Sequence, residues 1–242
     1  MALETKVAVM QPYFLPYLGY FSLIHSVDKF IFFDDVQFNK KSWMCRNQVL
    51  NPTTGKSFYF RPGIEHTNYQ CKLKEVELSY SSEWRDTILN QLKCYKKSPF
   101  FRETFMLVEE ILNGDFKTLT EFNISSTILI SNYLGIKSVF MNFSDFDFPE
   151  NNKCGPGDWG REIAKLAEAN SYINAPGGEE FIFADKFTAE NMKLGFIQPQ
   201  IETYKQTDFP FISHLSILDV LFFNGKERTS KLVQNYSIKW AN

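Results

Sequence analysis

The chain has few of the residues that usually reveal a function from sequence. Its 242 residues include only 3 histidines and 4 cysteines. The histidines have no metal-ligand spacing, and the cysteines show neither the C-x-x-C spacing of zinc and redox sites nor a disulfide framework. No Ser/His/Asp or G-x-S-x-G hydrolase signature occurs. We therefore expect free thiols in a reducing compartment and no metal site.

An excess of one charge is also lacking. The chain carries 26 basic and 28 acidic residues, a net charge of −2, with no basic stripe. This balance argues against a dedicated nucleic-acid surface. No apolar run approaches the about 18 residues of a membrane span, and the N-terminus lacks the pattern of a secretory signal. We expect a cytoplasmic protein without a membrane span.

Aromatic residues, in contrast, are abundant. They make up 17% of the chain, with 25 phenylalanines, within a hydrophobic content of 44%. A chain of this length and composition buries a sizeable core. Most rings are expected there, although aromatic side chains also form the apolar walls of ligand pockets.

Short apolar runs alternate with helix-length segments, a pattern typical of an α/β domain with a mainly parallel sheet. Lys6–Met10 and Lys29–Phe33 read as buried strands joined by a crossover helix within Gly19–Val27. Later segments continue the alternation: strands at Ser138–Met141, Ser171–Asn174 and Ile197–Ile201, and helices at Gly160–Ala169 and Leu215–Phe223, the last ending at Asn224-Gly225. We expect one domain over residues 1–242.

Residues 82–135 interrupt this alternation. Apolar residues recur there at intervals of three or four, which predicts three consecutive helices. Pro99, Asn113-Gly114 and Gly135 mark their ends. We predict a helical insert or lid beside the sheet.

The first strand runs into a proline-rich aromatic loop. Gln11 is followed by Tyr13, Tyr17 and Tyr20, with two prolines and one glycine between them. Proline fixes φ and glycine permits close backbone approach, so this loop is expected to be rigid. One interpretation is a tight turn filled with core aromatics. The other is a pocket floor at the carboxyl end of a parallel strand, with Gln11 orienting the ligand and the tyrosines stacking on it.

The second strand ends in Asp34-Asp35. Such carboxylates can bind Mg²⁺, accept a proton or bind ribose hydroxyls. Adjacent strand residues point to opposite faces, so one is expected to face the pocket and the other to cap a loop or helix. Downstream, Gln37, Arg46 and Asn47 are candidate binding residues. Arg46 can clamp a phosphate or carboxylate, and a surface salt bridge is the alternative.

Two further signals are weaker. Gly177-Gly178 follows a strand, where glycine backbone can cradle a phosphate or sugar, although a plain turn is commoner. Asp145-Phe146-Asp147 matches the D-x-D pattern of metal-dependent glycosyltransferases, a triplet that acidic loops often produce by chance.

Together these segments resemble the WbqC-like family, over nearly the whole chain. The matching stretches are Gln11–Phe21, Asp28–Phe38, Arg46-Asn47, Gly177-Gly178 and Leu215–Gly225. The family is associated with bacterial surface-polysaccharide (O-antigen) gene clusters. The resemblance implies a transferase that attaches an amino acid such as glycine, or another acyl group, to the amine of a nucleotide-linked amino sugar. The activated donor is left open between a thioester, an aminoacyl-tRNA and an adenylate, and no cofactor is identified.

A second resemblance concerns the fold. The strand, loop, helix and strand of the N-terminal region are similar to the start of HxGH nucleotidyltransferases and pantothenate synthetase-like enzymes. It implies a Rossmann-like (nucleotidyltransferase-like) sheet. The loop Pro16–Tyr20 lacks the two histidines of those enzymes, which argues against adenylation by their route.

Under the leading hypothesis Asp34 or Asp35 is the general base that deprotonates the sugar amine, and no metal is assigned. Gln11, Tyr13, Tyr17, Tyr20, Gln37, Arg46, Asn47, Gly177 and Gly178 are the predicted substrate-binding residues. Two alternatives stay open. One is a glycosyltransferase that uses Asp145 and Asp147 to hold a metal, and the other is a non-catalytic sugar-nucleotide-binding protein.

Overall fold

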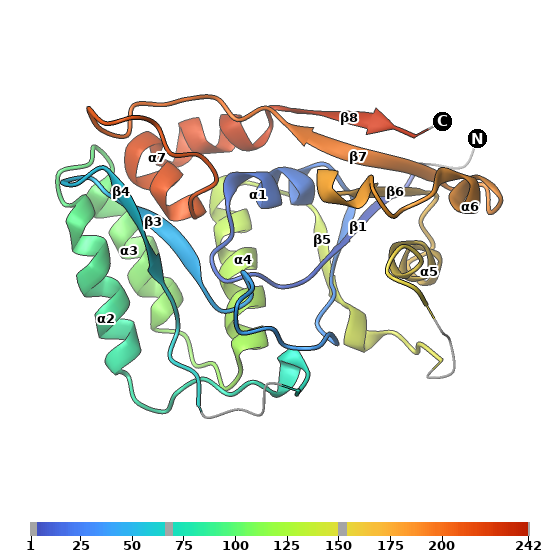
Figure 1. Cartoon of the computed structure of the whole chain (residues 1–242), viewed down its shortest axis with the longest axis horizontal. Helices are drawn as coiled ribbons and strands as arrows, with labels where there is room; N and C mark the ends of the chain where they lie inside the picture. Colours follow the sequence, from blue (N-terminus) through green and yellow to red (C-terminus); the bar gives the residue numbers. More distant parts are fainter. Residues whose placement is uncertain (1–3, 66–69, 150–153, 242) are drawn as a thin grey trace.

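A mostly parallel sheet lies at the centre of the protein (Figure 1), in a computed structural model that describes residues 4–65, 70–149 and 154–241. In spatial order its strands are β5 (Val139–Asn142), β2 (Lys29–Phe32), β1 (Lys6–Met10), β6 (Ser171–Asn174), β7 (Lys193–Pro199) and β8 (Tyr236–Trp240). The first five pair in parallel, and β8 runs antiparallel to β7. The expected Rossmann-like α/β fold is confirmed.

The strand order changes direction at β1. From this strand the chain adds β2 and then β5 on one side, and later β6 and β7 on the other. Val7 pairs with Lys29 of β2 and also with Tyr172 of β6, so β1 is hydrogen-bonded on both edges. In open α/β sheets, ligands bind outside the carboxyl ends of the strands at such a reversal. The topology therefore directs attention to the carboxyl ends of β1 and β6.

Both faces of the sheet are covered. Alternate side chains of each strand point to opposite faces, so Ala8 belongs to one buried cluster while Val7 and Val9 belong to another. The larger cluster includes residues of α1 (Leu18–His25), α4 (Leu119–Leu134) and α7 (Ile217–Val233). The smaller includes residues of α5 (Trp159–Leu166) and α6 (Ala184–Thr188). The molecule thus has three layers.

Helices fill the stretch between residues 82 and 135, next to a hairpin of β3 (Asn47–Asn51) and β4 (Lys56–Phe60). They are α2 (Glu83–Leu92), α3 (Phe101–Leu112) and α4, which pack in sequence on one side of the molecule (Figure 1). Thr118 and Glu121 form a capping box at the start of α4, and left-handed Gly135 ends it. The role of this region as an insert or lid remains a prediction.

The last long helix differs from the expected one. We expected it to end at Asn224-Gly225, but α7 continues to Val233. Gly225 has a φ of 65° and a ψ of −176°, so the backbone leaves the helical conformation there and then resumes it. The glycine therefore marks a kink between two helical segments. The remaining short elements are 3₁₀ helices: η1 (Leu73–Glu75), η2 (Lys93–Tyr95), η3 (Phe143–Asp145) and η4 (Pro176–Gly178).

No helix in the part of the chain that the structure describes is long and apolar enough to cross a membrane. This agrees with the sequence, which lacks a long apolar run.

A buried carboxylate ties α7 to the hairpin. Asp219 is fully buried, and its oxygens accept hydrogen bonds from the hydroxyls of Tyr95 (2.5 Å) and Tyr204 (2.7 Å) and from Nε2 of Gln206 (2.8 Å). The Tyr95 hydroxyl in turn accepts from the backbone N–H of Leu50 in β3. Burial raises the pKa of Asp219, although the three donors act to lower it. The network is complete, so we assign it to stability.

We predict that Asp219→Asn lowers the free energy of unfolding by about 1–3 kcal/mol, because the amide turns a donor toward a donor in a buried site. The folded state binds the Asp219 proton more tightly than the unfolded state does, so this group's contribution falls as pH rises through its raised pKa. The difference in unfolding free energy between the unaltered chain and Asp219→Asn should therefore be largest at acidic pH.

Denaturant titrations across acidic and neutral pH measure this deficit. Asp208→Asn, at an almost fully exposed carboxylate, is the control and should change stability little. A deficit that grows with pH would contradict the raised pKa.

Candidate functional site

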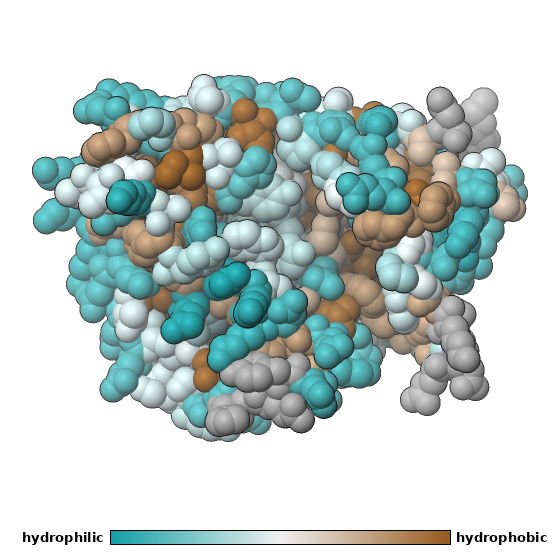
Figure 2. Space-filling model, viewed as in Figure 1, coloured by the Kyte–Doolittle hydropathy of each residue, from teal (hydrophilic) through white to brown (hydrophobic). Residues whose placement is uncertain are grey.

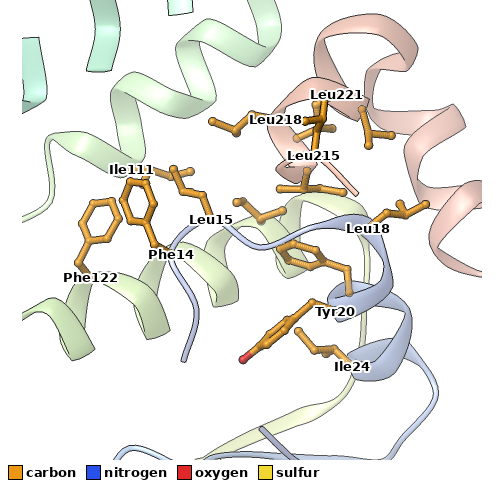
Figure 3. Packing of buried hydrophobic residues seen from close by; sticks show 14 of the residues in the cluster. Phe14, Leu15, Leu18, Tyr20, Ile24, Ile111, Phe122, Leu215, Leu218 and Leu221 are labelled. Atoms are coloured by element: carbon orange, nitrogen blue, oxygen red, sulfur yellow. The ribbon is translucent and has the colours of Figure 1, made fainter. Parts of the chain in front are cut away.

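The loop of residues 11–17 is buried and strained. Phe14 and Leu15 have no exposed surface, and they point into the cluster between α3, α4 and α7 (Figure 3). Leu15 has a φ of 42°, in the left-handed region that leucine rarely adopts. Such strain costs about 1–3 kcal/mol and persists only where the surroundings impose it. Contacts with distant elements hold the loop in this conformation.

Side chains from distant elements satisfy the loop's carbonyl groups. Asn47 Nδ2 donates to the carbonyls of Phe14 (3.1 Å) and Leu15 (2.7 Å). The Ser216 hydroxyl also donates to Leu15 O (2.7 Å), and Asn123 Nδ2 donates to Pro12 O (3.1 Å). A buried loop needs such partners because unpaired carbonyls are costly away from water.

The Tyr20 hydroxyl donates to the carbonyl of Gln11 at 2.8 Å. This bond fixes the backbone of Gln11 at the carboxyl end of β1. Tyr20 is itself fully buried, and its ring packs 5.6 Å from that of Tyr13. The position of Gln11 is therefore set by the core and not by solvent.

A cavity of about 530 Å³ lies where the strand order reverses. Its walls come from the carboxyl ends of β1 and β6, from Phe33 after β2, and from the first residues of α5. In Figure 2 hydrophobic side chains are recessed between the centre of the view and α5. The volume is in the range of small-molecule sites. This cavity, the switch-point cavity, is the candidate site.

Glycines shape its walls. A Cβ on Gly160 would lie 2.3 Å from the Tyr172 ring, and one on Gly178 would lie 2.0 Å from Nδ2 of Asn174. A Cβ on Gly177 would meet nothing within 4 Å. Gly160 and Gly178 thus make room for the two side chains of β6, while Gly177 leaves open space at the cavity.

The polar groups of the cavity are uncharged. Gln11, Tyr13 and Asn174 line it, together with Tyr172, whose hydroxyl is 3.2 Å from Oδ1 of Asn174. Burial raises the pKa of both Tyr13 and Tyr172, so these hydroxyls stay protonated at neutral pH and can donate hydrogen bonds. Trp159 and Phe181 add aromatic surface. The arrangement suits a ligand with flat or apolar surfaces and several hydrogen-bonding groups.

The two aspartates lie outside the lining of this cavity. Asp34 is buried, and it accepts hydrogen bonds from the backbone N–H (2.9 Å) and hydroxyl (2.5 Å) of Ser144. Asp35 forms ion pairs with Lys72 (2.8 Å) and Lys74 (3.2 Å). Burial acts to raise the pKa of Asp35, but the two lysines lower it overall. Asp34 thus caps the segment at Ser144, and Asp35 belongs to a surface cluster with two lysines.

The other predicted residues are divided among several places. Gln11, Tyr13, Gly177 and Gly178 come together at the cavity. Tyr17 and Tyr20 pack against the core, and Asn47 supports the loop. Gln37 forms an isolated β-bridge with Lys72, while Arg46 lines a different cavity.

Part of the lining has no motif of its own in the sequence. These residues are Trp159, Tyr172, Asn174 and Phe181, although the strand Ser171–Asn174 is itself predicted. The signal that finds them is topological: residues after the strand next to β1 lie at the reversal. That signal needs the strand order, which no local pattern supplies.

Metal-binding groups do not gather among the residues that the structure describes. No three His, Cys, Asp or Glu side chains there could hold a metal ion together. The four cysteines are free thiols, as expected.

Comparison with known proteins places the chain beside one family. The model of the WbqC-like protein family matches residues 11–231. The uncharacterized protein Rv1507c of Mycobacterium tuberculosis is 27% identical over 225 residues, which cover 92% of this chain and 95% of the relative. No solved structure matches.

Asn47→Ala should lower the free energy of unfolding by about 1–3 kcal/mol, because the buried Phe14 carbonyl loses its side-chain donor and the Leu15 carbonyl keeps only Ser216. Chemical denaturation measures the change, and Asn113→Ala at an exposed position is the control. Unchanged stability of Asn47→Ala would contradict the structural role assigned to this side chain.

Proposed function

The chain belongs to the WbqC-like protein family, and we propose that it is a transferase of bacterial surface-polysaccharide biosynthesis. It attaches an amino acid such as glycine, or another acyl group, to the amine of a nucleotide-linked amino sugar. The switch-point cavity receives the sugar nucleotide. Its position at the reversal of the strand order is the observation that carries the proposal.

The lining of the cavity supports a ligand of this class. Trp159, Phe181 and Tyr13 provide ring surfaces for a base or sugar, and Gln11 and Asn174 provide amide groups for hydroxyls and carbonyls. Gly177 leaves the backbone open to close approach. Binding here orients the sugar amine toward an acyl donor, whose class is a thioester, an aminoacyl-tRNA or an adenylate.

In the proposed reaction the amine nitrogen attacks the acyl carbon. A carbon–nitrogen bond forms, the bond to the donor's leaving group breaks, and the amine loses a proton. We assign this proton to Asp34 or Asp35 as general base, the two carboxylates that follow β2 directly after Phe33 of the cavity wall. The uncharged hydroxyl of Tyr13 is a donor to the ligand.

A ligand-binding test uses two neighbouring glycines. Gly178→Ala drives a Cβ into Asn174 and reshapes the cavity, whereas Gly177→Ala adds a methyl group to open space. We expect UDP- and dTDP-linked amino sugars to raise the melting temperature of the unaltered chain by mass action. Gly178→Ala should bind them about tenfold or more weakly, by titration calorimetry.

Melting temperatures measured without ligand show whether each variant is folded. Absence of binding by any amino-sugar nucleotide, or equal binding by a well-folded Gly178→Ala, would contradict the use of this cavity.

A second test concerns proton transfer. Asp34→Asn keeps the side-chain shape beside Ser144, and Asp35→Asn removes the charge from an exposed ion pair. Loss of a general base should lower turnover by about 10²–10⁴-fold while sugar-nucleotide binding persists. Asp145→Asn, at an exposed position outside the cavity, is the control. If the double variant at positions 34 and 35 turns over normally, neither carboxylate is the base.

One observation favours a second candidate, a non-catalytic sugar-nucleotide-binding protein. Among the residues that the structure describes, the lining of the switch-point cavity contains no Asp, Glu, Lys, Arg or His. Tight binding of an amino-sugar nucleotide without product from any of the three donor classes would favour this candidate. A metal-dependent glycosyltransferase would instead lose activity with Asp145→Asn and with chelators.

A further inference from the structure

A second cavity lies between the end of β4 and α2. Its volume is about 550 Å³, and Arg46, Tyr59, Arg61 and Trp84 line it. None of the described residues that line it is acidic, and none of them lines the switch-point cavity. In Figure 2 strongly hydrophilic side chains gather in front of the lower ends of β3 and β4. We call it the hairpin cavity.

Arg46 is held in a fixed orientation, and no acidic partner pairs with it in the part of the chain that the structure describes. Its Nη2 donates to the backbone carbonyl of Lys41, and its Cζ lies 4.7 Å from the centre of the Tyr59 ring. Its Nε is buried and has no hydrogen-bond partner within the described residues. A guanidinium placed this way retains donors for a ligand, and its order is already established before binding.

Arg61 adds a second guanidinium. It is exposed, and no carboxylate pairs with it within residues 4–65, 70–149 and 154–241. Burial raises the pKa of the Cys45 thiol, while Arg46, Arg61 and Lys40 each act to lower it. All three positive charges therefore act on the same small region. Two guanidinium groups that line one cavity suit the charge of a phosphate, and each can donate to its oxygens.

Aromatic surface adjoins the charges. Tyr59 is 47% exposed and Trp43 is 43% exposed, with ring centres 6.5 Å apart and an angle of 29° between the rings. Large rings are normally buried. Arg46 and Trp43 both adjoin the Tyr59 ring, and the part of the ring pair that stays exposed is available to a flat ligand. Trp84 forms a fixed wall, because it is buried and packs edge-on against Phe122.

We propose that the hairpin cavity binds a nucleoside phosphate, with Arg46 and Arg61 on the phosphate and Tyr59 stacked on the base. Inorganic phosphate alone would leave the exposed rings unused, and a neutral ring compound would leave both guanidinium groups without an anion. The site is separate from the switch-point cavity and does not depend on the proposed function.

Three ligands test the phosphate part and the base part of the site separately. AMP, inorganic phosphate and adenosine are each titrated calorimetrically against the full chain. Arg61→Gln should weaken AMP and phosphate by about tenfold or more, since charge-assisted hydrogen bonds are lost. Tyr59→Leu should weaken AMP by about tenfold and leave phosphate unchanged, because only stacking is lost. Arg102→Gln, an exposed arginine on α3, should change neither affinity.

Arg61→Lys keeps the charge but not the planar fork, so its affinity for AMP should lie between those of the unaltered chain and Arg61→Gln. Melting temperatures confirm that each variant is folded. If AMP binds no better than adenosine, or if neither Arg61→Gln nor Tyr59→Leu weakens it, the proposal is overturned.

Photolabelling locates the ligand. Azido-AMP should modify peptides within residues 56–63 or 84–91, and AMP should protect them. Labels confined to residues 174–182 would overturn the proposal, because they would place the nucleotide in the switch-point cavity. A short single-stranded RNA distinguishes the source of the nucleotide: equal affinity supports a free nucleotide, and much tighter binding supports the end of an RNA chain.

Discussion

The buried loop of residues 11–17 is the constraint on which the rest of the structure depends. Its backbone connects β1 to α1 through the core, where each carbonyl needs a partner. Asn47 lies at the start of the hairpin, Asn123 on α4 and Ser216 at the start of α7, and each donates to the loop. One strained segment therefore joins elements that are more than a hundred residues apart in sequence.

This anchoring fixes one wall of the switch-point cavity. Because Tyr20 and the three donors hold the loop, Gln11 and Tyr13 enter the switch-point cavity from a rigid support. At the other wall, Gly160 and Gly178 have no side chains and so leave room for Tyr172 and Asn174 of β6. A site on rigid elements loses little conformational entropy when it binds a ligand. The cavity thus combines a preformed shape with neutral hydrogen-bonding groups.

The sequence predicts four of the parallel strands closely because they are short apolar runs, as in Lys6–Met10, and Gly135 predicts the end of α4. It places β7 too late, since that strand begins at Lys193 and not at Ile197, and it does not predict β8. It predicts the partners of polar residues poorly. Asp34 follows an apolar strand and Asn47 follows Arg46, positions that suggest ligand binding, but their contacts are Ser144, Phe14 and Leu15. Such pairings depend on which distant backbone groups are buried beside them, and spacing along the chain does not encode this.

One hydrogen-bonded stretch of backbone contributes a side chain to each of the two cavities. The backbone N–H of Phe14 donates to the carbonyl of Trp43 at 2.8 Å, so the segment before β3 and the loop after β1 form one hydrogen-bonded unit. Arg46 extends from this unit into the hairpin cavity, and Tyr13 extends from it into the switch-point cavity. Buried hydrogen bonds from Asn47 and Asn123 hold this unit, so one constrained stretch of backbone supports both side chains.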